Sequence, residues 1–143
     1  TGGFMKIKKF LISLLLLICC MLACAACSNI IEFNFDENST VKLTYTCNDE
    51  DKNFNAELTA EQSHSFVLSL NKISYSEVNE HIDFGPSYDR LRITIGTDSI
   101  DLYDVTYAIR NGGYLYFNGK FCQSEDKFGF LEHYMAEYSP NID

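Results

Sequence analysis

From residue 31 onward, apolar and polar residues alternate in short segments, as in half-buried β-strands. Residues 31–36 and 41–47 both alternate in this way, with a turn at residues 37–39 between them. The two segments are predicted to form a hairpin. A short strand is expected at 54–58 after a polar turn.

The clearest hairpin surrounds the turn Gly96-Thr97-Asp98-Ser99. With this turn, Ile95 should face Ile100 and Ile93 should face Leu102 on the core side. Arg92 should then face Tyr103, and Thr94 should face Asp101, on the other side. Further strands are expected at 73–78, 107–110 and 114–117, the last followed by the turn signal Asn118-Gly119.

Two segments change to the helical period. Thr59 and Gln62 have the spacing of a capping box, and the apolar stripe Phe66, Val67, Leu70 and Ile73 follows them. Ser124 is predicted to cap a last helix with the stripe Phe128, Leu131, Met135 and Tyr138. The pattern predicts an α+β fold with a single antiparallel, meander-rich β-sheet and two helices packed on one face.

The first 28 residues have a different pattern. Lys6, Lys8 and Lys9 precede an apolar run through residue 26, which is shorter than the roughly 20 apolar residues that span a bilayer. The run ends in Leu22-Ala23-Cys24-Ala25-Ala26-Cys27-Ser28. This motif resembles the lipobox of bacterial lipoproteins.

The resemblance implies that residues 5–26 are a removed signal peptide and that Cys27 is lipidated, with Cys24 as the alternative site. An ordinary cleaved secretory peptide is a further alternative. Residues 1–4 precede Met5 and are interpreted as non-native. The expected location is the extracytoplasmic face of the cell membrane, with the protein attached through its N-terminal lipid.

Residues 27–143 are enough for one domain and too few for two. Without the three signal lysines, eight basic residues face twenty acidic ones, a net charge of −12. Such a domain is repelled by phosphate, so nucleic acid and anionic headgroups are not expected partners. Cationic partners remain open.

Of the six cysteines, only Cys47 and Cys122 would remain free in the mature domain. In an exported protein they are candidates for a disulfide, and a pair of buried thiols is the alternative. No C-x-x-C motif remains in the mature domain, which disfavours a redox role.

A loop with four metal-ligand residue types is a weak metal candidate. Glu77, Glu80, His81 and Asp83 lie within seven residues, but without an ordered ligand spacing, so a solvated acidic loop is favoured. No nucleophile-base motif, phosphate loop or dinucleotide fingerprint is present. We therefore predict no catalytic residue, no cofactor and no enzyme activity.

Aromatic residues concentrate on the last predicted strands. Arg92, Tyr103, Tyr114 and Tyr116 are candidates for an exposed binding face, although tyrosines also form ordinary cross-strand pairs. The architecture resembles small lipoproteins of Gram-positive, clostridia-like bacteria. The predicted function is a membrane-anchored binding or interaction domain for an envelope protein, peptide or glycan. The alternatives are an envelope inhibitor or immunity-type protein and a metal-dependent hydrolytic enzyme.

Overall fold

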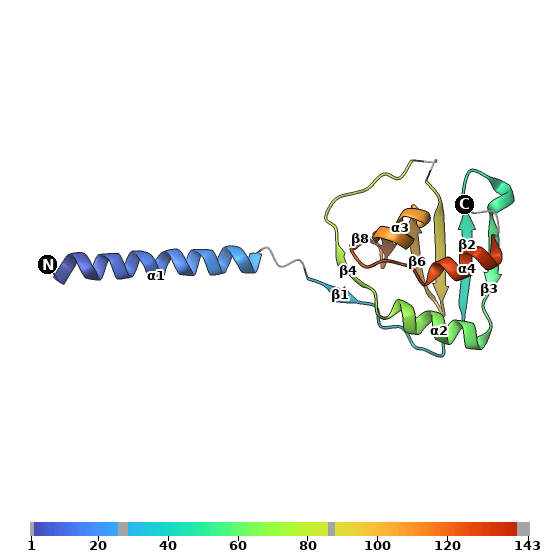
Figure 1. Cartoon of the computed structure of the whole chain (residues 1–143), viewed down its shortest axis with the longest axis horizontal. Coiled ribbons are helices and arrows are strands. Elements are labelled where there is room, and N and C mark those ends of the chain that lie inside the picture. Colours follow the sequence, from blue (N-terminus) through green and yellow to red (C-terminus); the bar gives the residue numbers. More distant parts are fainter. Residues whose placement is uncertain (1, 26–28, 86–87, 140–143) are drawn as a thin grey trace.

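The structure is a computed structural model that describes residues 2–25, 29–85 and 88–139. The N-terminal helix α1 (Gly2–Ala25) extends away from the rest of the chain as an isolated rod (Figure 1). Within the described residues, none of the helices combines the length and the apolar character needed to cross a membrane. The predicted lipidation site Cys27 lies outside the described residues, and Cys24 lies in the last turn of α1.

One antiparallel sheet forms the centre of the domain, which confirms the α+β class. Its strands are β1 (Ile31–Glu32), β2 (Val41–Thr46), β3 (Phe54–Glu57), β4 (Ser74–Glu77), β5 (Arg90–Ile95), β6 (Asp98–Tyr103), β7 (Gly113–Phe117) and β8 (Lys120–Ser124). They are arranged in the order β1-β4-β8-β7-β6-β5-β2-β3. The segment from β5 to β8 is therefore a meander, as the alternation predicts.

The β5–β6 hairpin has the predicted faces but not the predicted partners. Ile95 pairs with Asp98 and Ile93 pairs with Ile100, so the turn consists of two residues instead of four. Gly96 has a φ of 59°, which permits this tighter turn. Because the register shifts by two positions, each side chain keeps its face. Arg92 consequently faces Asp101 instead of Tyr103.

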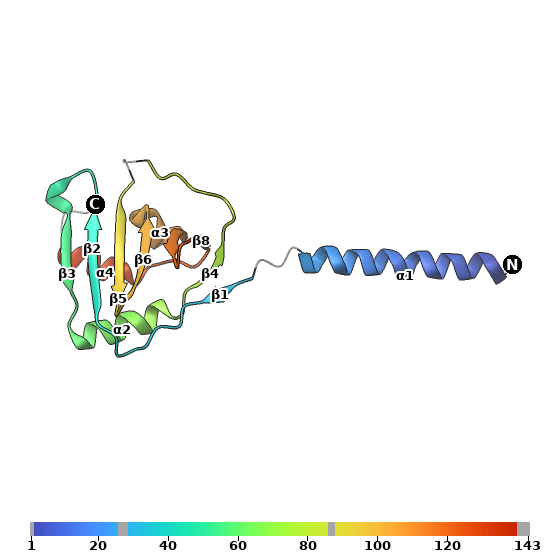
Figure 2. The same cartoon turned by 180° about the vertical axis from the view of Figure 1, so that it is seen from behind.

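The predicted first hairpin is wrong. β1 pairs with β4, whereas β2 lies between β3 and β5 at the opposite end of the sheet (Figure 2). The cause is the aromatic packing of the linking segment, because the Phe33 ring contacts the rings of Tyr75 and Phe117 at 4.5 and 5.4 Å. Asn71 also holds the backbone N–H and C=O of Phe35 through its side-chain amide.

The helices agree with the sequence pattern only in part. Helix α2 (Ala60–Leu70) begins with the predicted capping box, in which both Thr59 and Gln62 make their hydrogen bonds. Helix α4 (Leu131–Tyr138) begins later than expected, and Ser124 does not cap it. Ser124 instead ends β8 and donates its hydroxyl proton to the Ser74 carbonyl at 2.7 Å. A 3-10 helix, η1 (Glu50–Lys52), fills the turn between β2 and β3.

A third helix of the domain replaces a predicted strand. Residues 107–110 belong to α3 (Val105–Asn111), which connects β6 to β7. Val105 and Ala108 are buried and leave Tyr107 exposed, as one turn of an amphipathic helix requires. The prediction of two helices therefore omitted α3.

We call the buried side of the sheet the inner face. On the β5–β6 hairpin it carries Leu91, Ile93, Ile95, Ile100 and Leu102, each at most 2% exposed. These residues belong to one hydrophobic cluster with members of all three domain helices, including Phe66, Leu70, Ala108, Leu131 and Met135. The opposite side, the outer face, carries Arg92, Asp101, Tyr103, Tyr114 and Tyr116.

Candidate ligand-binding site

The predicted binding residues share the outer face, and an ion pair fixes one of them. The Arg92 guanidinium donates two hydrogen bonds to the Asp101 carboxylate, at 2.7 and 2.9 Å. These bonds raise the pKa of Arg92 above its ordinary value. Asp101 in turn lies opposite Tyr116 on β7. Arg92 is thus paired within the sheet.

The loop between β4 and β5 crosses the outer face and packs an aromatic ring onto it. The Phe84 ring stacks on Tyr103 with centroids 4.1 Å apart and planes 5° apart. The rings of Tyr88 and Tyr114 also contact the Phe84 ring, with their centroids 5.7 and 6.0 Å from its centroid. This packing partly buries the Tyr103 side chain, and burial, followed by the nearby Asp101 charge, raises its pKa.

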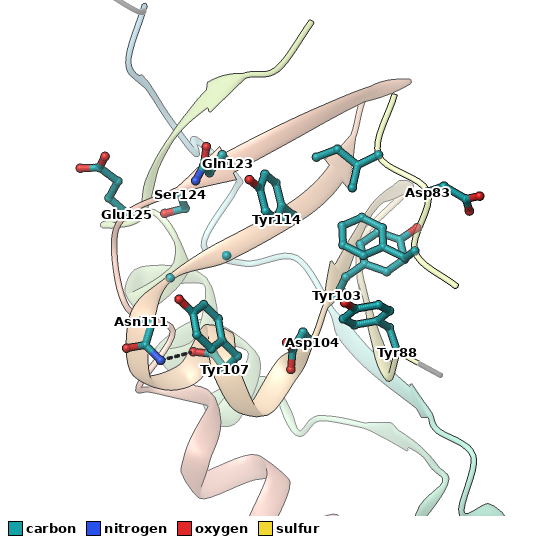
Figure 3. Close-up of a pocket in the computed structure, with 14 residues that line it drawn as sticks. Asp83, Tyr88, Tyr103, Asp104, Tyr107, Asn111, Tyr114, Gln123, Ser124 and Glu125 are labelled. Atoms are coloured by element: carbon teal, nitrogen blue, oxygen red, sulfur yellow. Dashed lines mark hydrogen bonds between the residues drawn. The ribbon is translucent and has the colours of Figure 1, made fainter. Parts of the chain in front are cut away.

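Between this loop and α3 lies a pocket of about 510 Å³, which we call the tyrosine pocket. Figure 3 shows Tyr107 and Tyr114 on one side of it, Tyr103 and Tyr88 on the other, and Asp104 between the two groups. The described residues that line it are Ile82, Asp83, Phe84, Tyr88, Tyr103, Asp104, Tyr107, Asn111, Gly112, Gly113, Tyr114, Gln123, Ser124 and Glu125. The size is within the usual range of small-molecule sites.

Two unusual backbone conformations shape the pocket. Asp104 adopts a left-handed conformation with φ of 50°, and there the chain leaves β6 and begins α3. Gly112 has a φ of 77°, and a Cβ at this position would overlap the backbone of Ser124 and Glu125. The chain can therefore turn sharply from α3 into β7. This turn brings Tyr107 of the helix beside Tyr114 of the strand.

A second cavity of about 610 Å³ lies on the other side of the crossing loop. Its lining includes Asp101, Tyr103 and Tyr116, together with Glu77, Glu80 and His81 from the loop region. Lys120 reaches into this cavity and pairs with Glu77 at 2.8 Å. The two cavities share Tyr103.

The structure does not assemble the metal candidates. Glu77 is paired with Lys120, the His81 ring packs against Phe121 at 5.3 Å, and Asp83 lines the other cavity. No group of three potential ligands suited to a metal ion occurs among the described residues. Glu77, Glu80 and His81 thus line one cavity without forming a set of ligands suited to a metal ion, and Asp83 lines the other cavity.

The cysteine pair is also separated, so the predicted disulfide is absent. Cys47 and Cys122 are both free thiols. Cys47 follows β2 and Cys122 lies in β8, with β5, β6 and β7 between these strands. Four strand spacings amount to roughly 19 Å, far beyond the Cα separation of a disulfide. Of the alternative, a pair of buried thiols, only Cys122 is buried, whereas Cys47 is half-buried.

The tyrosine pocket combines predicted residues with residues that the sequence pattern misplaced. Tyr103 and Tyr114 were candidates for the binding face, and both line the pocket. The sequence pattern predicts a strand for Tyr107, which lies in α3. The signal that was available is compositional, because aromatic residues are unusually dense between residues 84 and 121.

Comparison of the chain with protein-family models, with curated proteins and with solved structures finds no match.

Proposed function

We propose that this protein is a lipid-anchored extracytoplasmic binding domain and that the tyrosine pocket is its ligand site. The lipobox resemblance of residues 5–28 supports the anchor. The pocket supports the binding role, since exposed tyrosines provide large apolar contact area together with polar groups. Tyr88 and Tyr107 are 50% and 57% exposed, more than packing alone would favour.

This proposal assigns different roles to the two faces of the sheet. Helices α2 and α4 would cover the inner face, and the outer face would carry the ligand site. The support is the strict alternation along β5, where Leu91, Ile93 and Ile95 are buried while Arg92 is exposed. Stability would then depend on one face and binding on the other.

The observation that carries the proposal is the convergence of tyrosines from separate elements. Tyr103 comes from β6, Tyr107 from α3, Tyr114 from β7 and Tyr88 from the crossing loop. Ordinary cross-strand pairing accounts for Tyr103 and Tyr114, but not for Tyr107 on a helix. The arrangement leaves a cavity between the rings instead of a packed core.

Two neighbouring tyrosines provide a matched test. Tyr114 and Tyr116 lie on the same face of β7 and are 37% and 36% exposed, but only Tyr114 lines the tyrosine pocket. A fragment library should be screened by ligand-detected NMR against the wild type, Tyr114→Ala and Tyr116→Ala. We expect a group of fragments to lose binding in Tyr114→Ala and to keep it in Tyr116→Ala. Binders that respond equally to both changes, or to neither, would remove the pocket from the proposal.

The anchor has its own test, because the Cys27 thiol is the proposed acyl acceptor. Cys27→Ala should release the protein from the membrane fraction or leave an uncleaved precursor, while Cys24→Ala should leave the anchoring intact. Mass spectrometry of the mature N-terminus measures the modification directly. Loss of the lipid in Cys24→Ala alone would transfer the assignment to Cys24.

A further inference from the structure

We propose that the tyrosine pocket binds an organic cation, namely an ammonium group carried by a small amine or by a lysine side chain. This inference rests on the proposed function only in taking the pocket as the ligand site. Three features of the described lining carry it: tyrosine rings from separate elements around one space, carboxylates that make no hydrogen bond or ion pair with a described residue, and the absence of basic side chains among the described lining residues.

The rings provide faces and edges on several sides of one space. Phe84 occupies one face of Tyr103, and among the aromatic rings of the described residues Tyr88 and Tyr114 contact only that of Phe84. Tyr107 makes no ring contact with any other described residue that lines the pocket. Because its ring and that of Tyr114 lie across the cavity from Tyr88 in Figure 3, a ligand group in the centre would be surrounded by π-systems. Such arrangements bind ammonium groups through cation–π attraction.

Carboxylates complement the rings. Asp104 lies between the two groups of tyrosines in Figure 3, and its side chain does not cap α3. Asp83 and Glu125 stand at opposite ends of the pocket, with their carboxylates directed away from the rings (Figure 3). Asp104 would therefore contact the cation, and the two outer carboxylates would contribute a negative potential that attracts it.

The lining contains no counter-charge that would compete with a ligand. Among its described residues there is no lysine, arginine or histidine. Two arginines outside the lining, Arg90 and Arg92, lie near Tyr103; Arg92 is held by Asp101, and Lys120 is held by Glu77 in the second cavity. The whole chain carries a net charge of −9, which adds to the attraction of cations. The acidic lining therefore disfavours an anionic ligand.

A neutral sugar is the competing ligand class, because tyrosines and amide side chains such as Asn111 and Gln123 also suit hydroxyl groups. The two classes differ in their dependence on charge. Binding of an ammonium group should weaken when Asp104 loses its charge or when salt screens the pocket. Binding of a neutral sugar should respond to neither change.

The direct probes are choline and its neutral isostere 3,3-dimethylbutan-1-ol, with binding measured by NMR titration of the tyrosine ring signals. We expect choline to bind at least about tenfold more tightly than the isostere, in keeping with a desolvated cation–π contact. Spermidine represents an ammonium group of a small amine, and Nα-acetyl-lysine methylamide represents that of a lysine side chain in a peptide. The tighter binder of these two shows whether a free amine or a peptide is preferred.

Asp104→Asn is the matched charge variant, because asparagine also tolerates the left-handed backbone of this position. It should weaken choline binding about fivefold and leave the neutral isostere unchanged. Asp98→Asn removes the same charge at the exposed first residue of β6 and should have no effect. Circular dichroism and thermal melting check that both variants fold.

Two outcomes overturn the inference, and they differ in what else they affect. If the isostere or an N-acetylglucosamine trisaccharide binds as tightly as choline and Asp104→Asn has no effect, the cation proposal falls while the pocket remains the ligand site. If neither the cations, the isostere nor the trisaccharide shifts the Tyr107 and Tyr114 signals, and no screened fragment depends on Tyr114, both proposals fall.

Discussion

The two faces of the β5–β6 hairpin share the same strands and the same register, but different interactions build them. On the inner face, Leu91 pairs with Leu102 and Ile93 pairs with Ile100, and all four are within 1% of complete burial. On the outer face, the corresponding positions carry an ion pair and a half-buried tyrosine. The inner face is therefore stabilised by the burial of apolar side chains, and the outer face by pairwise contacts, namely the ion pair and the stack of Phe84 on Tyr103.

This difference has a consequence for function. Changes on the inner face should destabilise the fold. They should not give variants that fold normally but bind differently. Under the proposed function, changes on the outer face should affect binding while the domain stays folded. The proposed ligand site could then vary without rebuilding of the core.

The largest expected effect comes from the inner face. Leu102 is completely buried, so Leu102→Ala should lower the free energy of unfolding by about 2 to 4 kcal/mol through loss of contacts and formation of a cavity. Tyr103→Ala, one residue further along, should cost about 1 kcal/mol, because it removes the Phe84 stack. Urea denaturation of both variants measures the difference. Equal destabilisation would contradict the assignment of the two faces.

The next effect tests the ion pair on the outer face. Asp101→Asn should lower the free energy of unfolding by about 1 kcal/mol, because the pair is bidentate and the Asp101 side chain is only 11% exposed. The matched control is the cross-strand pair of Lys42 and Glu57, whose side chains are 55% and 62% exposed. Glu57→Gln should cost at most about 0.5 kcal/mol. If urea denaturation gives the same loss of unfolding free energy for Asp101→Asn and Glu57→Gln, geometry and burial do not distinguish the two ion pairs.

A smaller effect concerns polar contacts at the sheet edge, where Asp126 accepts hydrogen bonds from the Ser74 backbone N–H and hydroxyl, both at 2.7 Å. These two bonds, the backbone one first, lower the pKa of Asp126 below its ordinary value. The stabilisation is therefore fully present above about pH 4 and is lost as the pH falls through the lower pKa of the folded state.

The free energy of unfolding measured from about pH 5 to about pH 2 should fall less steeply in Asp126→Asn than in the wild type. Ser74→Ala removes one of the two donors and should give an intermediate slope. If the wild type and Asp126→Asn have the same slope, this carboxylate makes no pH-dependent contribution.

Local patterns in the sequence predicted which side chains of the β5–β6 hairpin lie on each face, but not the tyrosine pocket. The alternation in residues 90–103 identifies which side chains are buried, because register shifts of two positions leave the faces unchanged. The capping box at Thr59 is likewise a local signal, and it is present in the structure. Such features depend only on neighbours in the chain.

The tyrosine pocket depends on contacts between distant segments, which local periodicity does not encode. Tyr107 follows a left-handed residue at Asp104, and this conformation starts a short helix where alternation suggested a strand. The stack of Phe84 on Tyr103 forms across nineteen positions of sequence. The pairing of β1 with β4 is likewise set by aromatic contacts of Phe33 with residues far along the chain.

The last prediction concerns chemical access to the thiols of Cys47 and Cys122, the pair that the sequence suggested as a disulfide. Measuring it leaves the stability of the domain unchanged. Cys122 is on the inner face and 1% exposed, and burial, with a further contribution from the Glu77 charge, raises its pKa to about 11. Cys47 is half-buried at the end of β2. Because only the thiolate reacts with iodoacetamide, Cys122 should react more than about 100-fold more slowly than Cys47 at pH 8.

In urea both cysteines should react at similar rates, which provides the control, and peptide mapping by mass spectrometry locates the label. A cross-linked peptide joining Cys47 to Cys122 in the native protein would contradict the strand order, since three strands separate the two residues. Fast labelling of Cys122 in the folded state would instead show that the inner face opens to solvent, and the contrast between the two faces would then be weaker than the structure indicates.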